Sequence, residues 1–184
     1  DALHAGNSVG GVTRQRLRAD VVIGGMERPL LDQFDIGEVT FANDLAGAGK
    51  QADALVAAHP GTGYADQAEL AVARLEIENG KLDAAAPRLT RVMQKSQDPA
   101  LALVARLRLA RLQIEQGQAD AALATLSGAE AGAFAPRFAE VRGDALLAKG
   151  DRAGALAAYR EARAAGSAVD ADLLDLKIND LTRT

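Results

Sequence analysis

The sequence predicts an all-α fold: a right-handed solenoid of stacked helical hairpins that ends in a C-terminal capping helix. Three observations support this prediction. A short block of sequence recurs three times, starting at Ala73, Ala110 and Gly143. A glycine interrupts every copy at the same place. Apolar residues make up 48% of the chain but aromatic residues only 3%, so alanine, the best helix former, supplies much of the core.

The recurring block identifies the type of repeat. It reads ARLEIENGKLDAA from Ala73 and ARLQIEQGQADAA from Ala110, with nine of thirteen positions identical, and GDALLAKGDRAGA from Gly143. The offsets of 37 and 33 residues bracket the period of about 34 residues of tetratricopeptide repeats. We therefore predict a tetratricopeptide-like repeat domain over residues 43–184. Residues 1–42 form a poorly defined N-terminal segment that we expect to be partly disordered.

Each copy of the block predicts how one hairpin is built. The glycines Gly80, Gly117 and Gly150 are expected to end the first helix of each hairpin, because glycine readily takes the left-handed conformation of a helix C-terminus. Small residues should mark where the two helices touch: Ala73, Ala110 and Gly143 before the turn, and Ala85, Ala122 and Ala155 after it. Larger residues should fill the space between hairpins: Leu89, Leu126 and Tyr159. Acidic residues follow each turn, near the positive end of the second helix: Asp83, Asp120 and Asp151.

The helices can be placed in order along the chain. They are expected at residues 46–59, 64–79, 82–95, 98–116, 119–126, 136–149 and 152–165, followed by the capping helix at 168–181. Asp98 followed by Pro99 is a typical helix start. Upstream, residues 29–43 should hold the partner of the first of these helices, although the alternation of Phe34 and Ile36 is equally typical of a strand.

Composition and motifs argue against catalysis and cofactors. The chain has no cysteine and only two histidines, His4 and His59, so neither thiolate chemistry nor a histidine metal site is expected. The formal net charge of −4 argues against nucleic-acid binding, and the small basic cluster at residues 14–18 fits a solvated segment better. Residues 47–50, Gly-Ala-Gly-Lys, lack the first glycine and the Ser or Thr of a phosphate loop and are expected to form a turn between helices. Glu76 and Glu78 are expected to be surface charges.

A groove formed by the first helices of the hairpins is the candidate partner-binding site. In such solenoids this surface is concave and commonly binds extended partners. The candidate residues are Gln67, Leu70, Arg74 and Glu78 in one unit, Val104, Leu107, Arg111 and Glu115 in the next, and Arg137 and Asp144 in the third. Arg74 and Arg111 recur at matching positions and could hold carboxylates or backbone carbonyls. Alternatively, Arg74–Glu78 and Arg111–Glu115 are pairs that only support their own helices.

A family resemblance rests on four stretches of sequence. They are ANDLAGAGKQADALVAAHPGTGYA (42–65), LARLQIEQGQADAALATL (109–126), RGDALLAKGDRAGALAAY (142–159) and DLKIND (175–180). In these stretches the chain resembles the periplasmic tetratricopeptide-like domain of the YfgM family, the ancillary subunit of the SecYEG translocon. Residues 1–42 show neither the family's membrane anchor nor its first helix.

The resemblance implies a role at the bacterial inner membrane. Family members expose the repeat domain to the periplasm, associate with the SecYEG translocon and the periplasmic chaperone PpiD, and help pass secreted proteins to chaperones. The chain begins at Asp1 without an initiator Met, so we expect a fragment or processed form. Membrane attachment would then require an anchor that is absent from this chain, and this chain itself is expected to be soluble. The alternative is a tetratricopeptide adaptor of another envelope assembly complex.

Overall fold

The structure, a computed structural model, describes residues 45–166 and 171–183, which all belong to one compact unit of the chain, residues 39–184. This part contains eight α-helices and one short 3-10 helix, and no strand was found in it. The all-α prediction is therefore confirmed. The predicted N-terminal segment, including the proposed helix at residues 29–43, lies outside the described residues, and the boundary after residue 42 stays a prediction.

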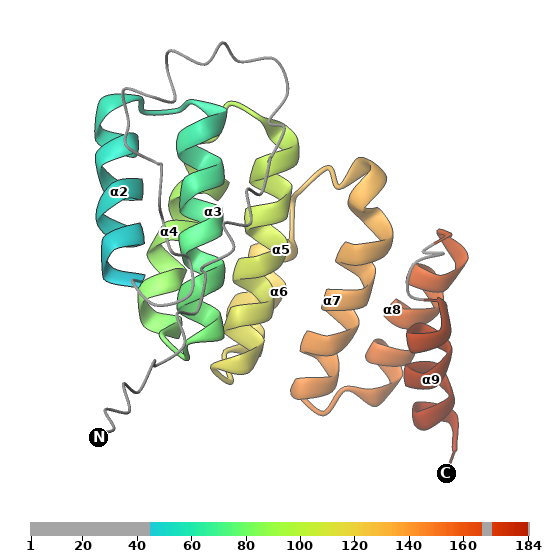
Figure 1. The fold of residues 1–184 in the computed structure, drawn as a ribbon. Coiled ribbons are helices and arrows are strands. Elements are labelled where there is room, and N and C mark those ends of the chain that lie inside the picture. The colour runs from blue at the N-terminus through green and yellow to red at the C-terminus, as the bar shows by residue number, and fades with distance from the viewer. Residues whose placement is uncertain (1–44, 167–170, 184) are drawn as a thin grey trace, which may run out of the picture. The chain divides into compact units, whose positions relative to one another are not determined.

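The helices follow the predicted order with ends that differ by no more than three residues (Figure 1). Their bounds are α2 Leu45–Ala58, α3 Gly63–Glu78, α4 Leu82–Lys95, α5 Pro99–Glu115, α6 Ala119–Leu126, η1 Gly132–Phe134, α7 Ala135–Ala148, α8 Arg152–Ala164 and α9 Ala171–Thr182. One local expectation was wrong, because residues 47–50 lie inside α2 and not in a turn. The apolar periodicity of the rest of α2 continues through them.

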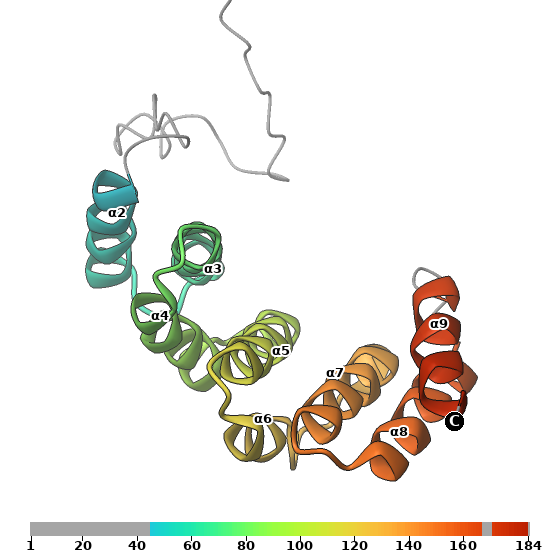
Figure 2. The same cartoon turned by 90° about the horizontal axis from the view of Figure 1, so that it is seen from below.

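The three hairpins α3–α4, α5–α6 and α7–α8 stand side by side in chain order. Seen along the helices, α3, α5 and α7 line the inner side of an arc, whereas α4, α6 and α8 form its outer side (Figure 2). The final helix, α9, packs against α8, as a capping helix should. No helix in the described residues is both long enough and apolar enough to span a bilayer.

Each hairpin turn has the same backbone conformation and the same pair of backbone hydrogen bonds. Gly80, Gly117 and Gly150 have positive φ angles of 72°, 74° and 83°. At the first turn, the amide of Gly80 donates to the carbonyl of Ile77 at 2.9 Å and that of Lys81 donates to the carbonyl of Glu76 at 2.7 Å. This pair of bonds satisfies the last carbonyls of the helix, and the other two turns repeat it. The predicted role of the three glycines is confirmed.

The alternation of small and large residues also packs as predicted. The small residues at the two sides of each turn are completely or almost completely buried: Ala73, Ala85, Ala110, Ala122, Gly143 and Ala155. Leu89 and Leu126 are buried between their own hairpin and the next one, whereas Tyr159 is buried between α7, α8 and the capping helix α9. The small residues let the two helices of a hairpin approach closely, and the larger ones pack against the element that follows.

The acidic residues after the turns have two different roles. Asp83 in the first hairpin accepts a hydrogen bond of 3.0 Å from Gln116 in the second, and Asp120 in the second hairpin pairs with Lys149 in the third. Gln116 and Lys149 both directly precede the turn glycine of their own hairpin. Asp151 instead caps its own helix by accepting from the amide of Gly154 at 2.8 Å. Two of the three residues therefore link neighbouring hairpins.

Candidate partner-binding groove

The ten predicted groove residues all lie on α3, α5 and α7, the helices of the inner side. Their exposure differs. Gln67, Arg74, Glu78, Arg111 and Glu115 are exposed, whereas Val104, Arg137 and Asp144 are partly exposed. Leu70 and Leu107 are buried in the core between hairpins and offer little surface to a partner. The groove remains a prediction, but the structure limits its surface to the other eight residues.

The arginines at matching repeat positions have different partners. Arg74 Nε donates to Glu78 Oε1 at 2.7 Å, so this pair supports its own helix, as one of the two interpretations proposed. Arg111 instead lies 4.0 Å from Glu140 Oε2 on α7. Arg137 lies 3.8 Å from the same carboxylate. The second repeat therefore uses its arginine to face the next hairpin.

Sequence reasoning missed a third arginine on this surface. Arg108 of α5 is half-buried and donates from Nη1 to the carbonyl oxygen of Leu70 on α3 at 3.0 Å. Burial, and then the like charges of Arg74 and Arg111, lower the pKa of the Arg108 guanidinium below its ordinary value. The three side chains therefore lie within electrostatic reach of one another. We call Arg74, Arg108 and Arg111 the arginine cluster.

A signal for Arg108 is present in the sequence. Arg108 precedes Arg111 by three positions, and residues three apart on a helix share a face. In the first repeat the residue that corresponds to Arg108 is Ala71, so a comparison of the repeats does not reveal Arg108. A search for charged neighbours on one helix face would have found it.

In the third hairpin, the groove residue Asp144 is already bonded to other parts of the chain. Asp144 accepts hydrogen bonds from the Tyr159 hydroxyl at 2.8 Å and from Lys177 Nζ of α9 at 2.7 Å. Lys177 also donates to Glu140, which is almost fully buried, at 3.0 Å. Burial alone would lower the pKa of Lys177, but the bonds and charges of Asp144 and Glu140 raise it overall. Asp144 therefore helps to hold α9 in place and has little hydrogen-bonding capacity left for a partner protein.

A buried ionic network lies between α2, α3 and α4. Arg88 of α4 reaches Asp53 at 2.8 Å, Glu76 at 3.1 Å and Glu69 at 3.2 Å. The prediction that Glu76 is a surface charge was wrong, because only 7% of it is exposed; Glu78 is exposed, as predicted. Gly49 of α2 gives this guanidinium room, since a Cβ atom there would lie 3.3 Å from Arg88 Nη2. The network fastens α2 and α3 to α4.

The chemistry of the inner surface is that of charge recognition. The arginine cluster offers guanidinium groups that can donate two parallel hydrogen bonds to a carboxylate. Two of the nearby carboxylates already have basic partners: Glu78 pairs with Arg74, and Glu140 is shared by three basic side chains. In residues 45–166 and 171–183, no group of three or more His, Asp or Glu side chains is arranged to hold a metal ion.

Comparison with known proteins agrees with the repeat architecture. A family model described as a tetratricopeptide repeat-like domain matches residues 32–183. Among curated proteins, the ancillary SecYEG translocon subunit of Haemophilus influenzae is 33% identical over 126 residues, which is 68% of this chain and 62% of the relative. The chain thus spans about three-fifths of the length of that relative. No solved structure matches it.

The relative also bears on the resemblance noted in the sequence. Its description, an ancillary subunit of the SecYEG translocon, is the one that the sequence analysis attached to the YfgM family. The predicted resemblance is therefore confirmed, and the match covers about two-thirds of the chain.

Proposed function

Because this chain belongs to the tetratricopeptide repeat-like domain family, we propose that it is a non-catalytic scaffold whose inner surface binds other proteins. The observation that supports this most is the arginine cluster. Three guanidinium groups from two neighbouring hairpins share one surface, although their mutual repulsion opposes this placement. A bound anionic group would relieve that repulsion.

The proposed ligand is an acidic segment of a partner protein, lying across α3 and α5. Arg74 and Arg111 are exposed and can turn towards a carboxylate, while Arg108 is fixed by its bond to the carbonyl of Leu70. Val104, which is partly exposed on the same helix as Arg111, offers an apolar contact next to the charges. The partner's carboxylates would thus be fixed by charge, and its register by the apolar contact.

We propose that the partners belong to the bacterial secretion machinery. The relative from Haemophilus influenzae, which is 33% identical over 68% of this chain, is an ancillary subunit of the SecYEG translocon. By this proposal the chain works at the periplasmic face of the inner membrane, docks on the translocon and links it to a periplasmic chaperone such as PpiD. The chaperone link rests on the family resemblance alone.

The groove can be tested by charge reversal. The variant Arg74→Glu/Arg111→Glu places two negative charges in the arginine cluster, and we expect it to lose most capture of translocon subunits from detergent-solubilised inner membranes. A matched control, Arg152→Glu/Arg160→Glu, makes the same change in net charge on exposed residues of the outer helix α8. It should capture as the unmodified chain does. Circular dichroism should show similar helix content for all three proteins.

The outcomes separate the proposal from its rivals. Equal capture by the groove variant and the control would place the binding surface elsewhere. Recovery of outer-membrane assembly proteins, with no translocon subunit, would support an adaptor of another envelope complex. That result would change the identity of the partner and would leave the test of the groove by charge reversal unaffected.

A further inference from the structure

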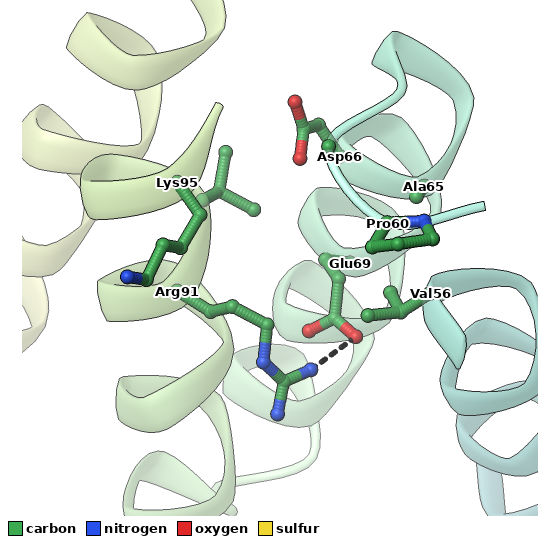
Figure 3. A pocket seen from close by; sticks show the side chains of 9 residues that line it. Val56, Pro60, Ala65, Asp66, Glu69, Arg91 and Lys95 are labelled. Atoms are coloured by element: carbon green, nitrogen blue, oxygen red, sulfur yellow. Dashed lines mark hydrogen bonds and ion pairs between the residues drawn. The ribbon is translucent and has the colours of Figure 1, made fainter. Parts of the chain in front are cut away.

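A hollow of about 310 Å³ lies on a different face of the first hairpin, where the end of α2 meets α3 and α4 (Figure 3). It is lined by Val56, Pro60, Gly61, Ala65, Asp66, Glu69, Arg91, Val92 and Lys95. None of these residues belongs to the predicted groove. The volume is at the lower end of the range of small-ligand sites, enough for one side chain.

Two buried carboxylates point into this hollow without full hydrogen bonding. Asp66 is 6% exposed, and its Oδ2 atom is buried with no hydrogen-bond partner among the described residues. Glu69 is 1% exposed; Arg88 and Arg91 both donate to its Oε1 atom, while Oε2 is buried without a partner there. A buried acceptor without a partner costs about 1–3 kcal/mol, and more if it is charged. In native proteins such buried atoms nearly always have a hydrogen-bond partner from the protein, an ordered water or an ion.

The basic residues around the hollow do not satisfy these atoms. In Figure 3, Arg91 and Lys95 extend from α4, and only Arg91 is joined to Glu69. No ion pair links Lys95 to Asp66 or Glu69 in the described part of the chain. Asp66 lies in the first turn of α3, next to the positive end of the helix. Asp66 Oδ2 and Glu69 Oε2 are therefore buried acceptors at the hollow that no donor of the described residues satisfies.

We propose that this hollow binds a basic side chain, lysine or arginine, of a partner polypeptide. The ammonium or guanidinium group would donate to Asp66 Oδ2 and Glu69 Oε2. The aliphatic stem would lie against Val56, Pro60 and Val92, which make up the apolar part of the lining. The site thus selects a positive charge on an apolar stem, the opposite preference to that of the arginine cluster.

The test uses short peptides and nuclear magnetic resonance of the isotope-labelled chain. The probe is acetyl-Ala-Lys-Ala amide, and its uncharged counterpart carries norleucine in place of lysine. We expect saturable shifts of the amide signals of Ala65, Asp66, Glu69 and Val92 with the lysine peptide and much weaker ones with the norleucine peptide. Asp66→Asn should weaken binding of the lysine peptide about tenfold or more, since it removes a charged acceptor.

Two controls make the result decisive. Glu130→Gln removes one exposed carboxylate from the loop before η1 and should leave binding unchanged. Asp66→Asn should melt at the same temperature as the unmodified chain or higher, because it removes an unpartnered buried charge and breaks no hydrogen bond. The proposal is overturned if the lysine peptide gives no saturable shift at tens of millimolar. It is also overturned if norleucine binds equally well, or if Asp66→Asn binds normally. None of these results would bear on the arginine cluster.

Discussion

Gly143 of α7 packs closely against Tyr159 of α8 in the third hairpin, and replacing Gly143 by alanine tests this contact. A Cβ atom at Gly143 would lie 2.4 Å from Cε1 and 2.5 Å from Cδ1 of Tyr159. Carbon atoms pack at about 3.5 Å or more, so the ring would have to move by about 1 Å. The ring is only 1% exposed, and its hydroxyl is bonded to Asp144 at 2.8 Å. It therefore has no free direction in which to move.

The expected change in the free energy of unfolding combines two costs and one gain. Inserting a methyl group into a full core costs about 1–3 kcal/mol. Displacing the Tyr159 hydroxyl from the Asp144 carboxylate adds about 1.5–3 kcal/mol, the range for a hydrogen bond to a charged group. Alanine is favoured over glycine inside a helix by about 1 kcal/mol, which offsets part of these costs. We therefore expect Gly143→Ala to lower the free energy of unfolding by about 1.5–5 kcal/mol.

Urea unfolding followed by circular dichroism measures this difference. Gly63→Ala is the matched control, because a Cβ atom at Gly63 would meet nothing within 4 Å and this variant should be as stable as the unmodified chain or more so. Combining Gly143→Ala with Tyr159→Leu should cost less than the sum of the two single changes, since the ring that clashes is gone. If Gly143→Ala proves as stable as Gly63→Ala, the argument from close packing is refuted.

Two further predictions concern the ionic networks. Arg88→Met should lower the free energy of unfolding by about 3–5 kcal/mol, because Glu69 and Glu76 would lose a shared buried partner; a loss below about 1 kcal/mol in urea unfolding would contradict this. In alkaline solution, stability should fall above about pH 10, the ordinary range of lysine and tyrosine. Burial raises the pKa of Tyr159, and carboxylate partners raise the pKa of Lys177 despite its burial. Both groups therefore keep their protons to a higher pH in the folded chain than in the unfolded chain. The stability that they provide is lost as the pH rises. Melting temperatures between about pH 8 and 11 should show a shallower decline in Lys177→Met.

The fold was predictable because its determinants repeat. Gly80, Gly117 and Gly150 end helices because glycine readily takes a positive φ angle. Ala73 and Leu89 are buried, and both stand at a constant distance along the chain from the turn glycine. Such local rules need no knowledge of distant contacts. Residues 47–50 show the limit of motif reasoning, since a glycine pair that suggested a turn lies inside α2.

The site was less predictable because its ion pairs join residues far apart in the sequence. Glu76 was expected at the surface, yet Arg88, twelve positions later, meets it in the interior. Asp144 was expected in the groove, yet Lys177 of α9 occupies it. Helical periodicity tells which face a residue lies on, but not which charge another helix brings to that face.

The hydrogen bonds between neighbouring hairpins also distinguish the third hairpin from the first two. Asp83 and Asp120 both stand three positions after a turn glycine, and each receives a donor from the following hairpin. The corresponding position in the third hairpin is Ala153, which has no acceptor to offer. The third hairpin therefore lacks the acceptor that joins the first two hairpins to their successors, and α9 packs against α8 through other contacts, such as the ion pair of Arg163 and Asp175.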